Sequence, residues 1–197
     1  MTKPSAFDLL VERHFLSEST CHNIINEATD GAFTPAPVYG STASGAIDER
    51  IRKASRLTVS QQTIDSVNQQ LLDYKPTIEQ HFQVSLRDCE EPQFLRYSVG
   101  DFFVAHQDGN TGMIRLASDA ERRISIVIFL NGQSDQPSPG TYSGGSLRFS
   151  DYRQRPPDRE FSMPVESGLL VAFRSELTHE VTPITRGERY SIVSWYR

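Results

Sequence analysis

The sequence lacks the features that mark secreted and membrane-spanning proteins. Only two cysteines occur, Cys21 and Cys89, and they show no C-x-x-C spacing. We therefore expect two free thiols in a reducing compartment rather than a disulfide framework. No stretch approaches the roughly 20 apolar residues that cross a bilayer, and residues 1–10 do not resemble a signal peptide. These absences predict a cytoplasmic protein without a membrane partner.

Positive charge is also scarce. The 20 Lys and Arg residues stand against 25 Asp and Glu residues, which gives a net charge of -5. This balance argues against a nucleic-acid partner, because general nucleic-acid binders present a basic face. Apolar side chains are plentiful, since 37% of the residues are hydrophobic and eleven are Phe. The composition predicts a packed core, and 197 residues suit one domain.

The chain divides into a helical support region, residues 1–90, and a β-rich region, residues 91–197, whose side chains alternate with the period of two typical of strands. Turn signals such as Asn131-Gly132 separate the strand-like segments. Eight strands are predicted, over residues 93–97, 102–106, 123–130, 145–149, 159–165, 169–173, 179–182 and 189–196. Short strands at this spacing favour a double-sheet jelly roll or a barrel, with the helices packed on one outer face.

Two helices are expected in the first region. One begins at Ser17 or Ser19, whose hydroxyl can cap it, and ends near Asp30. The other spans residues 60–74, and Pro76 is expected to break or restart it. The predicted buried faces comprise Cys21, Ile24, Ile25 and Ala28 in the first helix, and Ile64, Val67, Leu71 and Leu72 in the second.

His106 and Asp108 end one predicted strand, and His179 begins a later one. Side chains two residues apart share a face, so His106 and Asp108 can bind one metal ion, and His179 can add a third ligand. Two histidines and one carboxylate suit Fe(II) enzymes that activate oxygen, although zinc hydrolases use the same residue types. The other histidines lack an acidic partner at ligand spacing and are interpreted as ordinary surface or boundary residues: His14, His22 and His81.

Arg189 follows His179 by ten residues, and Ser191 shares its face of the same strand. A guanidinium group binds a carboxylate through two parallel hydrogen bonds, and a neighbouring hydroxyl can donate a third. This pair suits a dicarboxylate whose other end chelates the metal. The alternative for Arg189 is a surface salt bridge with Glu188.

Four segments carry a resemblance to a known family, and they occur in this order: Tyr97 to Asp108, Ile124 to Asn131, Gly144-Gly145-Ser146-Leu147, and His179 to Trp195. Over residues 93–197 the chain resembles the prolyl 4-hydroxylase-like branch of the Fe(II)- and 2-oxoglutarate-dependent dioxygenases. The resemblance implies a double-stranded β-helix (cupin-like jelly-roll) core and Fe(II) as the metal. It also implies 2-oxoglutarate and O2 as co-substrates, with ascorbate as an optional reductant.

The resemblance assigns roles to residues at the metal. It implies that His106, Asp108 and His179 are the iron ligands and form the catalytic centre. Relatives that halogenate lack the carboxylate, because halide takes its coordination position. The presence of Asp108 therefore favours hydroxylation.

The resemblance also assigns residues around the co-substrate. It implies that Arg189 binds the distal carboxylate of 2-oxoglutarate, and that Tyr97 and Trp195 lie in the same pocket. Some relatives have a tyrosine that touches this carboxylate where this chain has Phe129. Ser191 is a candidate to replace the missing hydroxyl.

The substrate is left open by the sequence. In relatives, the loops corresponding to residues 109–122 and 132–143 lie over the mouth of the site. Here these loops carry Arg115, Glu121, Arg122, Asp135 and Tyr142. Family analogy favours a prolyl residue in a protein or peptide, and a free amino acid or other small molecule is the alternative. Two other classes also stay open, a zinc-dependent hydrolase and a non-catalytic metal-binding jelly roll, and the oligomeric state is not implied.

Overall fold

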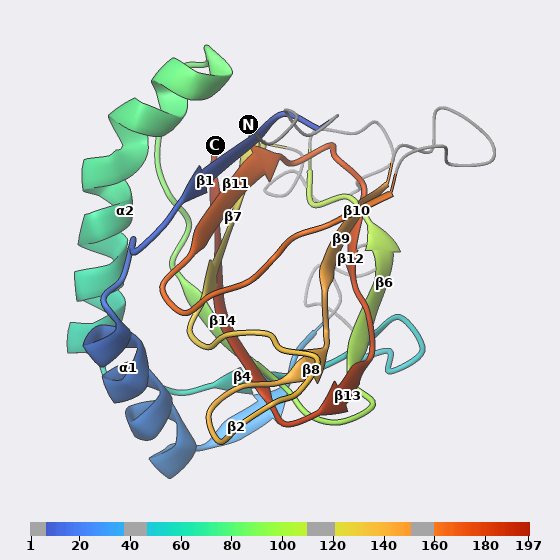
Figure 1. Ribbon diagram of the computed structural model, residues 1–197. Coiled ribbons are helices and arrows are strands. Elements are labelled where there is room, and N and C mark those ends of the chain that lie inside the picture. Colours follow the sequence, from blue (N-terminus) through green and yellow to red (C-terminus); the bar gives the residue numbers. More distant parts are fainter. Residues whose placement is uncertain (1–6, 38–46, 110–120, 151–159) are drawn as a thin grey trace.

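The computed structural model describes residues 7–37, 47–109, 121–150 and 160–197 (Figure 1). Within these ranges the chain forms two large β-sheets that face each other, and two helices run along the outer side of the larger sheet. None of the helices in the described ranges is long and apolar enough to span a membrane.

The larger sheet has seven antiparallel strands, and a strand from the C-terminal end of the chain lies at its centre. The strand order is β1 (Leu9–Glu12), β11 (Leu170–Arg174), β7 (Ile124–Phe129), β14 (Arg189–Tyr196), β5 (Gln93–Tyr97), β4 (Ser55–Leu57) and β2 (Phe33–Pro35). Because β14 pairs with β7 on one side and β5 on the other, it is covered along both edges.

The smaller sheet has five strands and faces the inner side of the larger one (Figure 1). Its order is β10 (Glu160–Ser162), β9 (Leu147–Ser150), β12 (His179–Val181), β6 (Phe102–His106) and β3 (Arg52–Lys53). A two-stranded ribbon of β8 (Ser143–Gly144) and β13 (Ile184–Arg186) lies at the lower end in Figure 1.

Both helices begin at a serine cap. In α1 (Glu18–Asp30) the Ser17 hydroxyl accepts a hydrogen bond from a first-turn N–H, and in α2 (Gln61–Phe82) Ser60 does the same. Glu27 of α1 accepts hydrogen bonds from the Ser60 backbone N–H and the Thr63 hydroxyl. These bonds fix the start of α2 against α1, so the helices meet the sheet as a pair.

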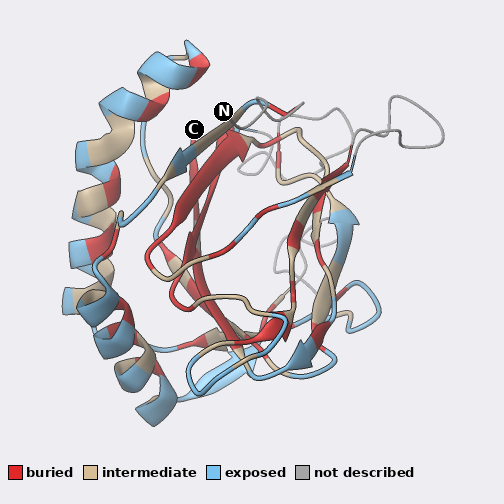
Figure 2. Ribbon diagram, viewed as in Figure 1, coloured by how far each residue is buried: buried red, intermediate tan, exposed pale blue. Residues whose placement is uncertain are grey.

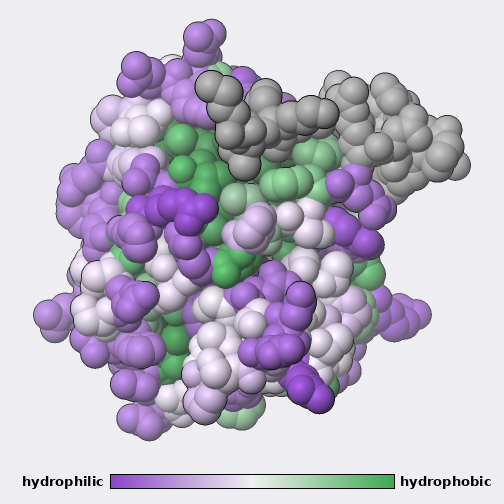
Figure 3. Space-filling view, in the orientation of Figure 1, coloured by the Kyte–Doolittle hydropathy of each residue, from purple (hydrophilic) through white to green (hydrophobic). Residues whose placement is uncertain are grey.

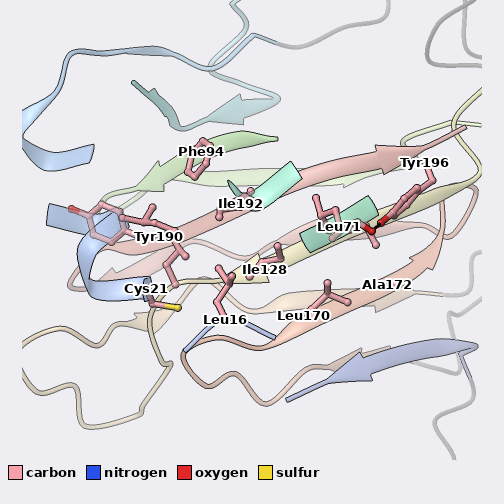
Figure 4. Close-up of a cluster of buried hydrophobic side chains, with 14 of the residues drawn as sticks. Leu16, Cys21, Leu71, Phe94, Ile128, Leu170, Ala172, Tyr190, Ile192 and Tyr196 are labelled. Atoms are coloured by element: carbon pink, nitrogen blue, oxygen red, sulfur yellow. Dashed lines mark hydrogen bonds between the residues drawn. The ribbon is translucent and has the colours of Figure 1, made fainter. Parts of the chain in front are cut away.

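The central strands β7 and β14 are buried on both faces (Figure 2). On β7, Ile124, Ile126 and Ile128 face the helices, while Val127 and Phe129 pack against the smaller sheet. Figure 4 shows the helix-facing layer, including the Tyr196 hydroxyl, which donates to the Leu71 carbonyl. Burial on both faces explains why β7 is an almost unbroken apolar run in the sequence.

The predicted fold, mostly β with N-terminal helices on an outer face, is confirmed. All eight predicted strands are present, and β5, β6 and β14 have the predicted bounds. The first helix and its Ser17 cap are also as predicted. The division into a support region and a core within one domain stays a prediction.

Expectations about residues 1–90 are wrong in three respects. Helix α2 continues through Pro76 to Phe82, because Pro76 lies on the solvent side, where water can satisfy the freed carbonyl, and buried residues anchor the helix on both sides of it. Leu72 is exposed rather than buried. The region also contributes β1 to β4, strands of two to four residues that are too short to show a period-two pattern.

Two adjacent leucines on α2 test how the helix packs on the sheet. Leu71 is 0% exposed and Leu72 is 38% exposed, so Leu71→Ala is expected to lower the free energy of unfolding by about 2–5 kcal/mol. Leu72→Ala is the matched control and is expected to cost less than about 1 kcal/mol. Urea denaturation of both variants makes the measurement, and equal losses would contradict this packing.

Candidate metal centre

Two neighbouring strand ends bring the candidate metal ligands together. β6 and β12 pair antiparallel, and His106 lies directly opposite His179. Asp108 follows two residues after His106. Its Oδ1 lies 3.4 Å from His106 Nε2, and its Oδ2 lies 3.5 Å from His179 Nε2. One ligand atom from each of the three residues therefore lies within 4.8 Å of the others.

Each imidazole is oriented by a hydrogen bond through Nδ1. His106 Nδ1 donates to the Val104 carbonyl at 2.8 Å, and His179 Nδ1 donates to the Leu177 carbonyl at 3.0 Å. Because a carbonyl only accepts, the proton is on Nδ1 and the lone pair is on Nε2. Nε2 is also the atom that faces Asp108, so both rings present a free lone pair to the same point.

Aromatic rings fix the planes of both histidines. Phe103 stacks on His106 with 3.6 Å between ring centres, and Phe173 meets His179 edge-on at 4.7 Å. These contacts leave each imidazole little freedom to rotate, which preorganises the ligand geometry.

A residue of the larger sheet orients the Asp108 carboxylate. Ser125 of β7 donates from Oγ to Asp108 Oδ2 at 2.7 Å, and its Oγ lies 3.0 Å from Ser175 Oγ. The N–H groups of Asp108 and Gly109 both donate to the Ser175 carbonyl, which ties the turn before β12 to the end of β6. The role of Ser125 was not predicted from the sequence, although a lone polar residue in an apolar strand is the signal that could have revealed it.

The protonation states of the cluster suit metal binding. Burial alone would raise the pKa of Asp108, but the charges of His179 and His106 and the hydrogen bond to His106 hold it well below its usual range. Burial, followed by the charge of His106, lowers the pKa of His179 to about 4. At neutral pH the cluster therefore offers a carboxylate and a neutral His179 imidazole, the forms that bind metals.

The donor set fits a divalent metal ion that keeps coordination positions open. Two imidazole nitrogens and one carboxylate converge on one point, which suits Fe(II), and zinc uses the same atoms. Within the described ranges, this is the one group of three such residues with ligand atoms this close. The roles of His106, Asp108 and His179 as ligands stay predictions that this geometry supports.

Arg189 places a cation deep between the sheets. It is 2% exposed, and its guanidinium carbon lies 5.1 Å from the centre of the Tyr97 ring and 5.0 Å from that of Phe129. Its Nε and Nη1 have no hydrogen-bond partner among the described residues. The alternative of a pair with Glu188 is not formed, because Glu188 accepts a hydrogen bond from the Tyr190 hydroxyl instead. Since a buried charge is costly without a partner, these donors suit an anion.

The other predicted pocket residues lie on the same side of the larger sheet as Arg189. Ser191 is the next inward-facing residue on β14, and its Oγ is buried without a partner in the described part of the chain. Tyr97 on β5 lies directly opposite Arg189. Trp195 lies near the other end of β14, opposite Ser125, and so close to the metal ligands. Their roles toward a co-substrate stay predictions.

The described charged loop residues that were expected over the mouth of the site are either exposed or engaged in ion pairs. Arg115 lies outside the described residues, as does most of the loop 109–122, and Asp135 is exposed. The others form ion pairs, Glu121 with Arg87 and Arg122 with Glu90. Arg122 is buried in its pair and offers a substrate no free charge, whereas Glu121 and Arg87 form an exposed surface pair.

Tyr142 contradicts the expectation that it lies over the mouth. It is 0% exposed and belongs to a buried cluster with Tyr97 and Ile184. The Arg189 charge reaches its hydroxyl and opposes the rise in the Tyr142 pKa that burial causes. The sequence placed Tyr142 in a polar loop, and no local pattern showed that its ring turns inward.

Residues 92–197 match the 2OG-Fe(II) oxygenase superfamily. The chain belongs to this family. Its members use Fe(II), 2-oxoglutarate and O2, the metal and co-substrates that the sequence led us to expect. The resemblance to prolyl 4-hydroxylase-like dioxygenases is therefore confirmed.

Individual relatives are similar in sequence and fold. A PKHD-type hydroxylase of Shewanella sp. strain MR-7 is 36% identical over 107 residues, which are 53% of this chain and 41% of that protein. The match thus spans less than half of that relative's length. A Pseudomonas putida prolyl-4-hydroxylase structure has a TM-score of 0.71 and 26% identity, covering 98% of this chain and 93% of that one. This likeness supports the jelly-roll core.

A third comparison shows the fold alone. It is a prolyl hydroxylase from Trichoplax adhaerens, solved in complex with a hypoxia inducible factor oxygen degradation domain peptide fragment. The TM-score is 0.69 at 16% sequence identity, and the likeness covers 97% of this chain and 84% of that chain. The same arrangement of sheets thus persists where little sequence is shared.

Loss of one histidine is expected to abolish tight metal binding. Loss of a residue that only orients a ligand lowers metal affinity about 10- to 100-fold. We predict that His179→Ala, which removes a ligand itself, weakens Mn(II) affinity by more than this. His22→Ala, on the exposed face of α1, is the control and should bind like the wild type. Isothermal titration calorimetry measures both, and equal affinities for wild type and His179→Ala would exclude this cluster as the metal site.

Loss of the Ser125 hydroxyl is expected to weaken metal binding without removing a ligand. Ser125→Ala takes away the hydrogen bond that orients Asp108, so Mn(II) affinity should fall about 10- to 100-fold. Ser194→Ala removes a buried serine that bonds to the Glu90 carbonyl on the opposite face of the sheet. This control should lower stability but leave Mn(II) affinity unchanged, and the idea fails if the two variants bind alike.

Proposed function

We propose that this chain is an Fe(II)- and 2-oxoglutarate-dependent dioxygenase that hydroxylates an unactivated C–H bond. The observation that carries the proposal is Arg189, a buried cation with unused donors on the sheet that also holds Asp108. A two-histidine, one-carboxylate cluster alone fits several classes of enzyme. A buried cation on the same side of the sheet narrows the choice to a ligand with an anionic group at some distance from the metal.

A dicarboxylate with a keto acid at one end meets this requirement. The keto acid end of 2-oxoglutarate can chelate a metal, and its distal carboxylate can accept two hydrogen bonds from the Arg189 guanidinium. The charge of Arg189 extends to His179, where it adds to the lowering of the pKa. The cation thus lies within electrostatic range of the metal ligands, as a shared ligand requires.

His106, Asp108 and His179 are the residues that would hold the iron, which with 2-oxoglutarate and O2 supplies the oxidising chemistry of this family. The chain itself orients and shields the reactants. Ser125 holds the Asp108 carboxylate, and Phe173 packs on His179 from the side of the core. Such apolar walls keep water away from the ligands.

The substrate we propose is a prolyl residue in a protein or peptide. The support is the likeness to the Pseudomonas putida prolyl-4-hydroxylase along nearly the whole chain, and the peptide bound to the Trichoplax adhaerens neighbour. Figure 3 shows apolar surface in the upper middle of the molecule, between the two sheets as drawn in Figure 1, which suits an apolar side chain. A free amino acid or another small molecule is the second candidate, and a cytoplasmic location stays a prediction.

Two other classes give Arg189 no role. A zinc-dependent hydrolase would use the three metal ligands and a water molecule, and a non-catalytic jelly roll would need the metal alone. Neither class explains a buried guanidinium with unused donors. Both predict that 2-oxoglutarate does not bind the metal-loaded protein.

The first test is turnover of 2-oxoglutarate to succinate with Fe(II) and ascorbate. We expect iron-dependent succinate from the wild type, above all with proline-containing peptides, and none from His106→Ala, because that variant lacks a metal ligand. Mass spectrometry of the peptides locates the added oxygen. If the iron-loaded wild type neither forms succinate nor binds 2-oxoglutarate, the dioxygenase proposal is wrong.

Arg189 is expected to govern the affinity for 2-oxoglutarate. Hydrogen bonds to charged groups contribute about 1.5–3 kcal/mol, so Arg189→Leu should raise KM for 2-oxoglutarate about 10- to 100-fold. Stability should change little, because the lost contacts with the Tyr97 and Phe129 rings are offset by the removal of a buried charge whose Nε and Nη1 have no hydrogen-bond partner within the described residues. Arg186→Leu, at an exposed position on β13, is the matched control, and steady-state succinate assays compare the two KM values.

A further inference from the structure

One buried hydroxyl next to Arg189 has no partner that explains it. The Tyr142 ring is 0% exposed, and its hydroxyl oxygen has no hydrogen-bond partner among the residues that the structure describes. Buried tyrosine hydroxyls normally find a hydrogen-bond partner, because leaving one unpaired destabilises the folded protein. A bound ligand that accepts a hydrogen bond from this hydroxyl would remove the destabilisation.

The backbone around Tyr142 directs its ring toward Arg189. Tyr142 bridges to Gln133, and its N–H donates to the Gly132 carbonyl at 3.2 Å, so the strand segment is fixed. The chain then bends through Gly144 and Gly145, with φ values of +70° and +60° that side-chain-bearing residues rarely adopt.

The side chains of Tyr142 and Arg189 both lie next to Gly145. A Cβ placed on Gly145 would lie 3.2 Å from Tyr142 Cε2 and 3.4 Å from Arg189 Cδ. The ring and the arginine side chain therefore both pack on the bare glycine backbone. The Cβ would lie 2.1 Å from Ile184 Cδ1, so a larger residue at this position would first displace Ile184 and then crowd the Tyr142 ring.

The rings that flank the guanidinium differ in what they offer an anion. Arg189 lies over Phe129, which has no hydroxyl, and over Tyr97. The Tyr142 hydroxyl lies within reach of the Arg189 charge, and burial keeps the phenol protonated by raising its pKa. Tyr142 is therefore a hydrogen-bond donor beside a cation, an arrangement that favours a carboxylate.

We propose that Tyr142 is a specificity-determining residue whose hydroxyl donates to the same carboxylate that Arg189 binds. The inference rests on the proposed function, since that carboxylate is the distal one of 2-oxoglutarate. Arg189 supplies the charge, and Tyr142 supplies a donor from the ribbon strand β8 side of the pocket. A site with a donor of this kind discriminates against 2-oxo acids that lack the distal carboxylate.

The test is binding of 2-oxoglutarate to the full chain loaded with Mn(II), measured by isothermal titration calorimetry. Tyr142→Phe should weaken 2-oxoglutarate binding about tenfold, the effect of one hydrogen bond to a charged group. Its affinity for Mn(II) and for 2-oxopentanoate, which has no distal carboxylate, should stay as in the wild type. Tyr74→Phe, whose hydroxyl bonds to Glu12 on the helix-covered side of the larger sheet, is the control and should bind both acids normally.

Thermal denaturation separates ligand binding from a structural role. Because the Tyr142 hydroxyl interacts with Arg189 but makes no hydrogen bond of normal geometry in the described residues, Tyr142→Phe should melt close to the wild-type temperature without ligand, and 2-oxoglutarate should raise its Tm less. A variant that melts lower without ligand and keeps the wild-type shift with 2-oxoglutarate would show a structural hydroxyl and overturn the proposal.

The outcomes also separate this inference from the proposed function. If Arg189→Leu loses affinity for 2-oxoglutarate and Tyr142→Phe does not, the assignment of Tyr142 is wrong and the dioxygenase proposal stands. If the Mn(II)-loaded wild type does not bind 2-oxoglutarate, both are wrong. Equal weakening of 2-oxoglutarate and 2-oxopentanoate by Tyr142→Phe would also overturn the inference, because the hydroxyl would then act at the metal end.

Discussion

The antiparallel pairing of β6 with β12 is the constraint on which the candidate site depends. It sets His106 opposite His179, although 73 positions separate the two in the chain. The register alone would leave Asp108 free to turn away. Ser175 prevents this, because its carbonyl accepts from the Asp108 N–H and its hydroxyl meets Ser125 on the larger sheet. The cluster is therefore fixed by both sheets, and a shift of one residue in either would separate the ligands.

Strand β14 links the stability of the fold to the anion pocket. Its outward residues, such as Ile192 and Tyr196, pack under the helices, while its inward residues include Arg189 and Ser191. Because alternate residues of one strand serve both purposes, packing of α1 and α2 on one face determines where the guanidinium lies on the other. The apolar layer thus acts as the rigid support that a preorganised binding site needs.

The sequence predicted the parts of the site that local patterns encode. Short apolar or alternating segments between turn signals marked the strands, and His106, Asp108, His179 and Arg189 stood at recognisable spacings. It could not predict what depends on distant contacts. Ser125 matters because it lies against Asp108, and Tyr142 is buried because its ring packs with residues distant in the chain, such as Tyr97 and Ile184.

Helix α2 shows that local sequence patterns are also insufficient to predict parts of the fold. The local rule that proline ends a helix is overridden at Pro76, because Val67 and Leu71 on one side and Ile78 and Phe82 on the other are all buried against the sheet. Tertiary packing of an amphipathic face stabilises a helix more than local propensity does. The solvent-facing position of Pro76 is the detail that a sequence pattern alone does not give.

The central position of β14 also governs when the protein can fold during synthesis. β5 and β7 are translated well before residues 189–196, and each has an open edge until β14 pairs between them. Unpaired edges of apolar strands invite association with other chains. The larger sheet therefore closes only after Tyr196 has left the ribosome, and its formation depends on non-local pairing, which is slow. Until then the edges of β5 and β7 that β14 will cover stay unpaired.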